Sequence, residues 1–164
     1  MLDLAVIRDI VAIASFIVAL GYYIINIRNQ RETRQAQLFM NIYNQSFNNQ
    51  KYQDAQKIMM TWNWSSFTEL MNTFFDSDKA SENMEALWTL SGFYEGVGVL
   101  VREDLLHIRY VANLMTYWVT SFYEKFDPYI DELRAETYPR ILSETEFLYR
   151  ELIEYIEKHP EIKK

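Results

Sequence analysis

The sequence contains no cysteine, and among its 164 residues there are only two histidines, three prolines and four glycines. Without cysteine, the chain has no disulfide, thiolate metal site, iron–sulfur cluster or cysteine nucleophile. So few glycines and prolines disfavour a β-rich fold, whose tight turns need them. These absences indicate an all-α fold and fit a cytoplasmic domain.

Positive charge is also scarce, since the chain carries a net charge of −7. Residues 1–34 hold four arginines against three acids, which leaves −8 for residues 35–164. Nucleic-acid binding needs a basic footprint on the domain. We therefore expect no nucleic-acid partner.

One long apolar run lies near the N-terminus. Residues 10–25 (IVAIASFIVALGYYII) carry no charge, and residues 4–27 are interrupted only by the adjacent Arg8 and Asp9. A helix of about 20 residues crosses the hydrocarbon core of a bilayer. No basic segment precedes Arg8 and no A-x-A site follows the run, which disfavours a cleaved signal peptide. The sequence predicts a transmembrane anchor over residues 1–27, in contact with the lipid bilayer.

The flanks of this run predict its orientation. Three arginines follow it and one precedes it, and the positive-inside rule places the more basic side in the cytoplasm. The predicted anchor flanks, including two interfacial tyrosines, are Arg8, Tyr22, Tyr23, Arg28, Arg31 and Arg34. We expect a single-pass protein of the cell membrane whose C-terminal domain is cytoplasmic.

Helix-spaced apolar residues continue through the rest of the chain. No helix breaker occurs between Ile27 and Asn44, so the anchor should continue into a juxtamembrane stalk helix over 28–50. A bundle of about four to six helices is expected over 51–164. The predicted helices cover 52–61, a segment after Ser65 or Ser66, 82–102, 108–126 and 144–159.

Particular residues predict where these helices begin and end. Ser81 is expected to cap the helix over 82–102, and Ser143-x-x-Glu146 has the pattern of a capping box. Asp127-Pro128 should end or kink the helix over 108–126, because proline disfavours a helical residue before it.

Several segments together form a pattern: the anchor followed by RETRQAQLFMNIYNQ (31–45), FYEGVGVLVREDLL (93–106), the series Trp118, Tyr123 and 128–130, and residues 134–148. In these segments the chain resembles an uncharacterised prokaryotic family of single-pass, membrane-anchored proteins. These motifs are aromatic and structural rather than catalytic. The resemblance implies a helical cytoplasmic domain and a membrane location, and it implies no known reaction or cofactor.

Glu95 is the candidate buried polar residue, because it lies in the apolar segment GFYEGVGVL. A buried carboxylate can serve as an acid, a base or a metal ligand. More often it pairs with an arginine, for which Arg102, Arg109 and Arg134 are candidates. We favour the structural pair.

Other candidate sites are weaker. Asp104-x-x-His107 has the spacing of two ligands on one helical face, but a ferritin-like di-metal site needs two Glu-x-x-His motifs and further carboxylates. Gly92-x-x-x-Gly96, with Ser91 and Gly98 beside it, indicates close helix packing more readily than ligand binding. The sequence predicts no catalytic residue, no metal site and no cofactor.

An apolar stripe on the predicted stalk is the candidate interaction surface. It consists of Phe39, Met40, Tyr43 and Phe47, and its polar surroundings are rich in Asn and Gln. Such a patch marks a contact site if its own bundle does not cover it. The alternative is that the stripe packs in the core.

We expect a non-enzymatic, membrane-tethered interaction or scaffold domain whose partner is another membrane or cytoplasmic protein. An accessory subunit of a larger membrane complex is the alternative, since small residues on the anchor suit contact with other helices. An enzyme with a site around Glu95 is the third hypothesis.

Overall fold

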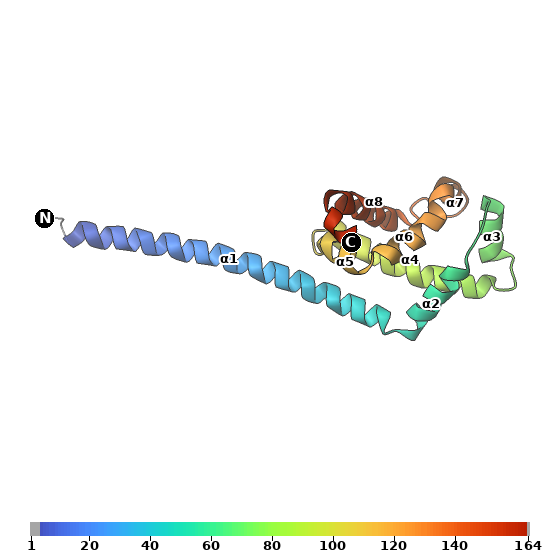
Figure 1. Cartoon of the computed structure of the whole chain (residues 1–164), viewed down its shortest axis with the longest axis horizontal. Helices are drawn as coiled ribbons and strands as arrows, with labels where there is room; N and C mark the ends of the chain where they lie inside the picture. The colour runs from blue at the N-terminus through green and yellow to red at the C-terminus, as the bar shows by residue number, and fades with distance from the viewer. Residues whose placement is uncertain (1–3, 164) are drawn as a thin grey trace. The chain divides into compact units, whose positions relative to one another are not determined.

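The computed structural model describes residues 4–163, which contain eight α-helices, two short 3-10 helices and no strand (Figure 1). The all-α prediction is confirmed. The elements are α1 (Leu4–Phe47), α2 (Gln50–Thr61), α3 (Phe67–Phe75), α4 (Ala80–Arg102), α5 (Ile108–Leu114), α6 (Thr116–Phe126), η1 (Asp127–Tyr129), α7 (Ile130–Glu136), α8 (Ser143–Lys158) and η2 (Pro160–Lys163).

The chain divides into two units at Gln37 and Leu38. The first unit is the N-terminal part of α1, whose side chains are exposed from Leu4 to Arg34. The second unit is a helical bundle that includes the last ten residues of α1 together with all later helices. The compact part of the molecule therefore begins inside the segment expected to be a stalk.

Helix α4 is the centre of the bundle, and it packs against α2, α3 and α8. The sequence predicts this place, because α4 is apolar on most of its circumference. Leu90, Tyr94 and Val97 are almost completely buried along it. Aromatic rings from other helices fill the remaining core, among them Phe122 and Phe126 of α6.

Two helix ends follow from the local sequence. The side chain of Ser66 accepts a hydrogen bond from the backbone N–H of Glu69 and caps α3, as predicted. After Phe126 the chain enters the 3-10 turn η1, which contains Pro128, and α6 ends there as predicted. Both signals act within four residues, which is why the sequence alone reveals them.

Three predictions about helix caps and continuity are wrong. Helix α4 begins at Ala80, so Ser81 lies inside it and provides no cap. The predicted helix over 108–126 is interrupted at Met115, whose backbone (φ −129°, ψ 3°) separates α5 from α6. Met115 is itself buried, so the apolar spacing continues across the break and does not reveal it.

The third wrong prediction is the capping box at Ser143, because α8 begins at Ser143 as expected but without that cap. Helix α8 follows Leu142, which has a left-handed backbone (φ 56°), and no side chain at this position forms the cap. The Glu146 carboxylate instead binds Arg134 and Arg150.

Of the three glycines expected to allow close helix packing, only Gly98 does so. Gly92 and Gly96 are exposed, and a Cβ atom at either position would have no neighbour within 4 Å. A Cβ at Gly98 would lie 2.3 Å from the backbone oxygen of Glu144. Gly98 is therefore the residue that allows α4 and α8 to approach, and the prediction for Gly92 and Gly96 is corrected.

Candidate interaction surface

The N-terminal part of α1 has the length and composition of a membrane span or a signal anchor. Within residues 4–163 it is the one helix that is long and apolar enough to cross a membrane, and none of its apolar window is buried. The predicted flanks Tyr22, Tyr23, Arg31 and Arg34 are all exposed. Arg8 pairs with Asp9 at 3.0 Å, and Arg28 pairs with Glu32 at 3.7 Å.

The apolar stripe predicted as an interaction surface is largely core. Phe39 is only 1% exposed, and its ring stacks on that of Tyr110 with 5.7 Å between centroids. Tyr43 and Phe47 stack on each other at 4.2 Å and pack against the core. Met40 alone remains accessible, at 43%. The prediction that these residues form a free surface is corrected: the bundle's own helices bury Phe39 and partly cover Tyr43 and Phe47.

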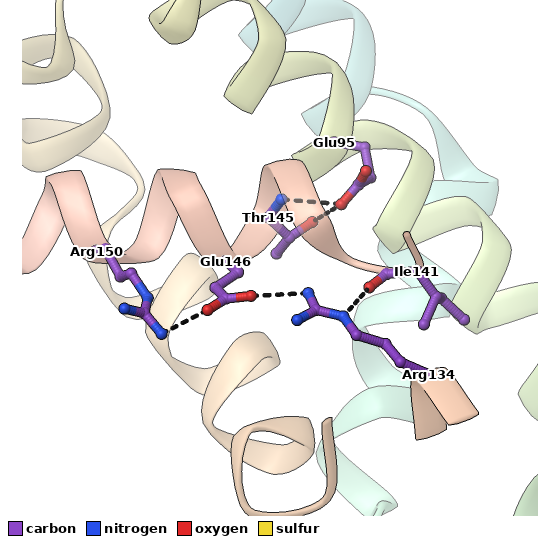
Figure 2. Close-up of polar contacts among 6 residues, drawn as sticks. All are labelled: Glu95, Arg134, Ile141, Thr145, Glu146 and Arg150. Carbon is purple, nitrogen blue, oxygen red and sulfur yellow. Dashed lines mark hydrogen bonds and ion pairs between the residues drawn. The ribbon is translucent and has the colours of Figure 1, made fainter. Parts of the chain in front are cut away.

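Glu95 binds the start of α8 rather than an arginine. Its carboxylate is half-buried and accepts hydrogen bonds from the backbone N–H of Thr145 at 2.8 Å and from the Thr145 hydroxyl at 2.9 Å (Figure 2). Thr145 lies in the first turn of α8, where backbone N–H groups have no partner within the helix. A negative charge is also favourable at this positive end of the helix dipole. Glu95 therefore caps α8 from a distant part of the sequence.

A separate ion-pair network is centred on the next residue of α8, Glu146. The Arg134 guanidinium donates to the Glu146 carboxylate at 2.7 Å and to the carbonyl oxygen of Ile141 at 3.3 Å, and Arg150 binds the same carboxylate (Figure 2). Burial raises the pKa of Glu146, but the two arginines outweigh this effect and hold the pKa below its ordinary value. These charged groups link α7 to α8, which is a structural task.

Two buried tyrosines form a separate polar pair. The hydroxyl oxygens of Tyr52 and Tyr94 lie 3.3 Å apart. Burial raises the pKa of Tyr52 to about 12 and raises that of Tyr94 well above its ordinary value. Both phenols therefore stay protonated near neutral pH. Tyr94 bonds toward α2 whereas Glu95 bonds toward α8, so these neighbours do not combine into one acid–base site.

The weaker metal candidates are not brought together. Asp104 lies in the turn after α4 with a left-handed backbone (φ 57°), and His107 caps α5 by accepting from the N–H of Arg109. Among residues 4–163, no three histidine or acidic side chains are grouped so that they could hold a metal ion.

The strongest candidate site is an apolar pocket of about 260 Å³ on the bundle, which we call the aromatic groove. Its floor consists of core residues from α3, α4, α6 and α7: Leu70, Phe74, Leu87, Phe126 and Leu133. Its rim carries three large aromatic side chains, which are Phe75 at 54% exposure, Trp88 at 61% and Tyr138 at 61%.

The chemistry of the groove differs from that of a typical ligand pocket. Its lining is almost entirely apolar, and its polar side-chain atoms are the Thr137 and Tyr138 hydroxyls and the indole N–H of Trp88. Pockets for drug-sized ligands and cofactors usually span about 300–1,000 Å³ and carry several placed polar groups, which this groove lacks. Exposed aromatic clusters at a pocket mark places where partner side chains become anchored.

Sequence reasoning missed the groove because no local pattern distinguishes an exposed aromatic from a core aromatic. Trp88 lies on the helix that is apolar on most of its circumference, so its periodicity predicts burial. Two weaker signals were present. Phe74 and Phe75 are adjacent, so one helix cannot bury both on the same face, and Tyr138 lies in a connecting segment beside Pro139.

Comparison with known protein families identifies the family of this chain. The family described as a domain of unknown function, DUF4760, matches residues 9–152 of the chain. The predicted resemblance to an uncharacterised family is confirmed by this match, which covers most of the chain. No curated protein and no solved structure matches the chain.

Proposed function

We propose that this chain, which belongs to the DUF4760 family, is a membrane-tethered domain that binds a partner protein through the aromatic groove. The groove is the observation that carries the proposal. Large aromatic side chains exposed around an apolar pocket lower the solubility of a protein. Such a patch is therefore typical of a surface that a partner covers. Trp and Tyr are also the residues that most often dominate binding energy at interfaces.

Binding rather than catalysis is the proposed mode of action. The half-buried carboxylates of Glu95 and Glu146 are occupied by Thr145, Arg134 and Arg150. The buried phenols of Tyr52 and Tyr94 are paired with each other. An acid–base site needs a titratable group free to meet a substrate, and these groups instead support the fold.

The tether is the N-terminal part of α1. A water-exposed apolar helix of this length would be costly, and a bilayer removes that cost. The excess of arginine after the span supports a cytoplasmic bundle, by the positive-inside rule.

Selective cysteine labelling tests this topology. Because the wild-type sequence has no cysteine, any label on the purified protein comes from the introduced residue. In intact cells, a membrane-impermeant maleimide should label a Leu2→Cys variant and should label Ser81→Cys only after lysis. Ser81 is exposed on the bundle, so burial within the fold would not mask it. Labelling of Ser81→Cys without lysis would place the bundle outside and refute the orientation.

Co-purification in mild detergent from the protein's native cells tests the function. Tyr138→Ala should reduce recovery of a stoichiometric partner by at least about five-fold, because an aromatic anchor near the centre of an interface typically contributes more than about 1 kcal/mol. Tyr117→Ala is the matched control, since Tyr117 is 59% exposed and does not line the groove. If Tyr138→Ala and Trp88→Ala both recover as much partner as the wild-type protein, with unchanged melting temperatures, the proposal is refuted.

An accessory subunit of a larger membrane complex is the second candidate. One face of the span carries the small residues Ala14, Ser15 and Ala19 beside Val11 and Val18. Small residues allow close approach of neighbouring transmembrane helices. In the same co-purification, a stoichiometric partner that persists in the groove variants and is lost when Ala14 and Ala19 are both replaced by leucine would favour this candidate.

A further inference from the structure

We infer that the partner segment in the aromatic groove is an amphipathic α-helix with an apolar face flanked by lysine or arginine. This inference rests on the proposed function, because it names the chemistry of the partner for the same groove. Three properties of the groove support it: its size, the elements that form it and the charge around it.

The size of the groove favours protein side chains over a free ligand. A volume of about 260 Å³ is below the usual range for cofactor pockets, but it suits one or two large apolar anchors. Its rim of Phe75, Trp88 and Tyr138 resembles the centre of a protein interface, where a few buried anchors contribute most of the binding energy.

The elements around the groove favour a helical partner. The groove is lined by α3, α4, the end of α6, α7 and the segment before α8. No strand occurs anywhere between residues 4 and 163, so a partner has no sheet edge here to extend. Apolar grooves between helices are instead typical sites for an amphipathic helix, which inserts side chains from positions i, i+3, i+4 and i+7.

The charge around the groove favours a basic partner. The segments that contribute residues to the groove (67–91 and 126–142) are rich in acids. Glu82 and Glu85 line a different pocket, where Glu85 pairs with Lys51. The other seven acidic residues of these segments are Glu69, Asp76, Asp78, Asp127, Asp131, Glu132 and Glu136. The same segments carry only three basic residues. Two of these, Arg134 and Arg140, already face Glu146 and Glu144 of α8.

Two of the acidic residues adjoin the rim directly. Asp76 follows Phe75, and Glu136 lies two residues before Tyr138. Both are exposed. Carboxylates around an apolar site attract cationic partners and repel lipid phosphates, fatty-acid carboxylates and acidic peptides. The combination of an apolar centre with an acidic surround therefore selects a helix with a basic rim.

Model peptides test the inference on the full chain in phosphatidylcholine nanodiscs, with empty nanodiscs as the blank. The main probe is a 14-residue leucine–lysine peptide with leucine at i, i+3, i+4 and i+7 spacing, and its matched control replaces every lysine by glutamate. Fluorescence anisotropy should give a Kd at least about ten-fold lower for the lysine peptide, because like charges oppose binding of the glutamate peptide. A proline–arginine peptide separates helix binding from recognition of an extended polyproline segment.

Variants locate the binding. Tyr138→Ala and Trp88→Ala should each raise the Kd of the lysine peptide by about ten-fold or more, as for anchors at interface centres. Tyr117→Ala should leave it unchanged. Asp76→Asn combined with Glu136→Gln should raise the Kd several-fold at low salt and less at high salt, because salt screens exposed charges.

The outcomes separate this inference from the proposed function. Equal binding of the lysine and glutamate peptides, tighter binding of the proline–arginine peptide, or equal effects of Tyr117→Ala and Tyr138→Ala would overturn the inference. If the natural partner is lost with Tyr138→Ala but the lysine peptide does not bind, the basic helix is refuted while the interaction domain stands. If neither partner nor peptide depends on Tyr138, both are refuted.

Discussion

Phe39→Ala should lower the free energy of unfolding of the bundle by about 3–5 kcal/mol, the usual cost of truncating a buried phenylalanine. The side chain is 1% exposed and packs against Tyr43 and Tyr110. Its removal would leave a cavity lined by aromatic rings, which cannot collapse easily. Urea unfolding of the full chain in detergent, followed by tryptophan fluorescence, measures the effect. All four tryptophans lie within residues 62–118, so the signal reports on the bundle alone.

Met40→Ala is the matched control in the neighbouring position. Met40 is 43% exposed, and a surface substitution of this kind should change stability by less than about 0.5 kcal/mol. If Phe39→Ala unfolds like the wild type and reduces recovery of a partner, the stripe on α1 is an interface after all. The stripe on α1 would then be a second candidate for the partner-binding surface, beside the aromatic groove.

The helices were largely predictable because their signals are local. Apolar residues at steps of three and four mark the core face of α4 and α8, and Ser66 and Pro128 mark helix ends within one turn. The break at Met115 was not predictable in this way. A one-residue interruption leaves the apolar spacing intact and is imposed by packing around a buried side chain.

The start of α8 shows why the polar contacts were harder to foresee. Ser143 and Glu146 have the local pattern of a cap, yet the cap comes from Glu95, fifty residues earlier. Likewise, Arg134 was considered as a partner for Glu95 but pairs with Glu146. Local sequence gives the chemical type of each side chain, whereas the choice among several carboxylates and arginines depends on tertiary packing.

The candidate surface was misplaced for a related reason. Periodicity predicts that a residue lies on the apolar face of its helix, but not whether another element covers that face. Phe39 is covered completely and Tyr43 and Phe47 are covered in part, whereas Phe75 and Trp88 are exposed. The acidic excess of residues 35–164, by contrast, was readable from composition. It becomes informative about a partner once the structure shows an apolar pocket among those charges.

Gly98→Ala and Gly96→Ala should change stability in opposite directions, although they are two residues apart on the same helix. At Gly98, a new Cβ would lie 2.3 Å from the backbone oxygen of Glu144, so α4 and α8 would have to separate. Overpacking of this kind typically costs about 1–3 kcal/mol. It would also disturb the contacts that Glu95 makes with the first turn of α8, because they join the same two helices.

At Gly96, a new Cβ meets no atom within 4 Å, and the position is exposed in the middle of α4. Alanine should therefore stabilise the bundle by about 0.5–1 kcal/mol through its higher helix propensity. The same urea titration measures both variants, and Gly96→Ala controls for the general effect of alanine in α4. A stabilised Gly98→Ala variant would mean that α4 and α8 lie farther apart than the structure shows. A destabilised Gly96→Ala variant would mean that another surface packs against that face of α4.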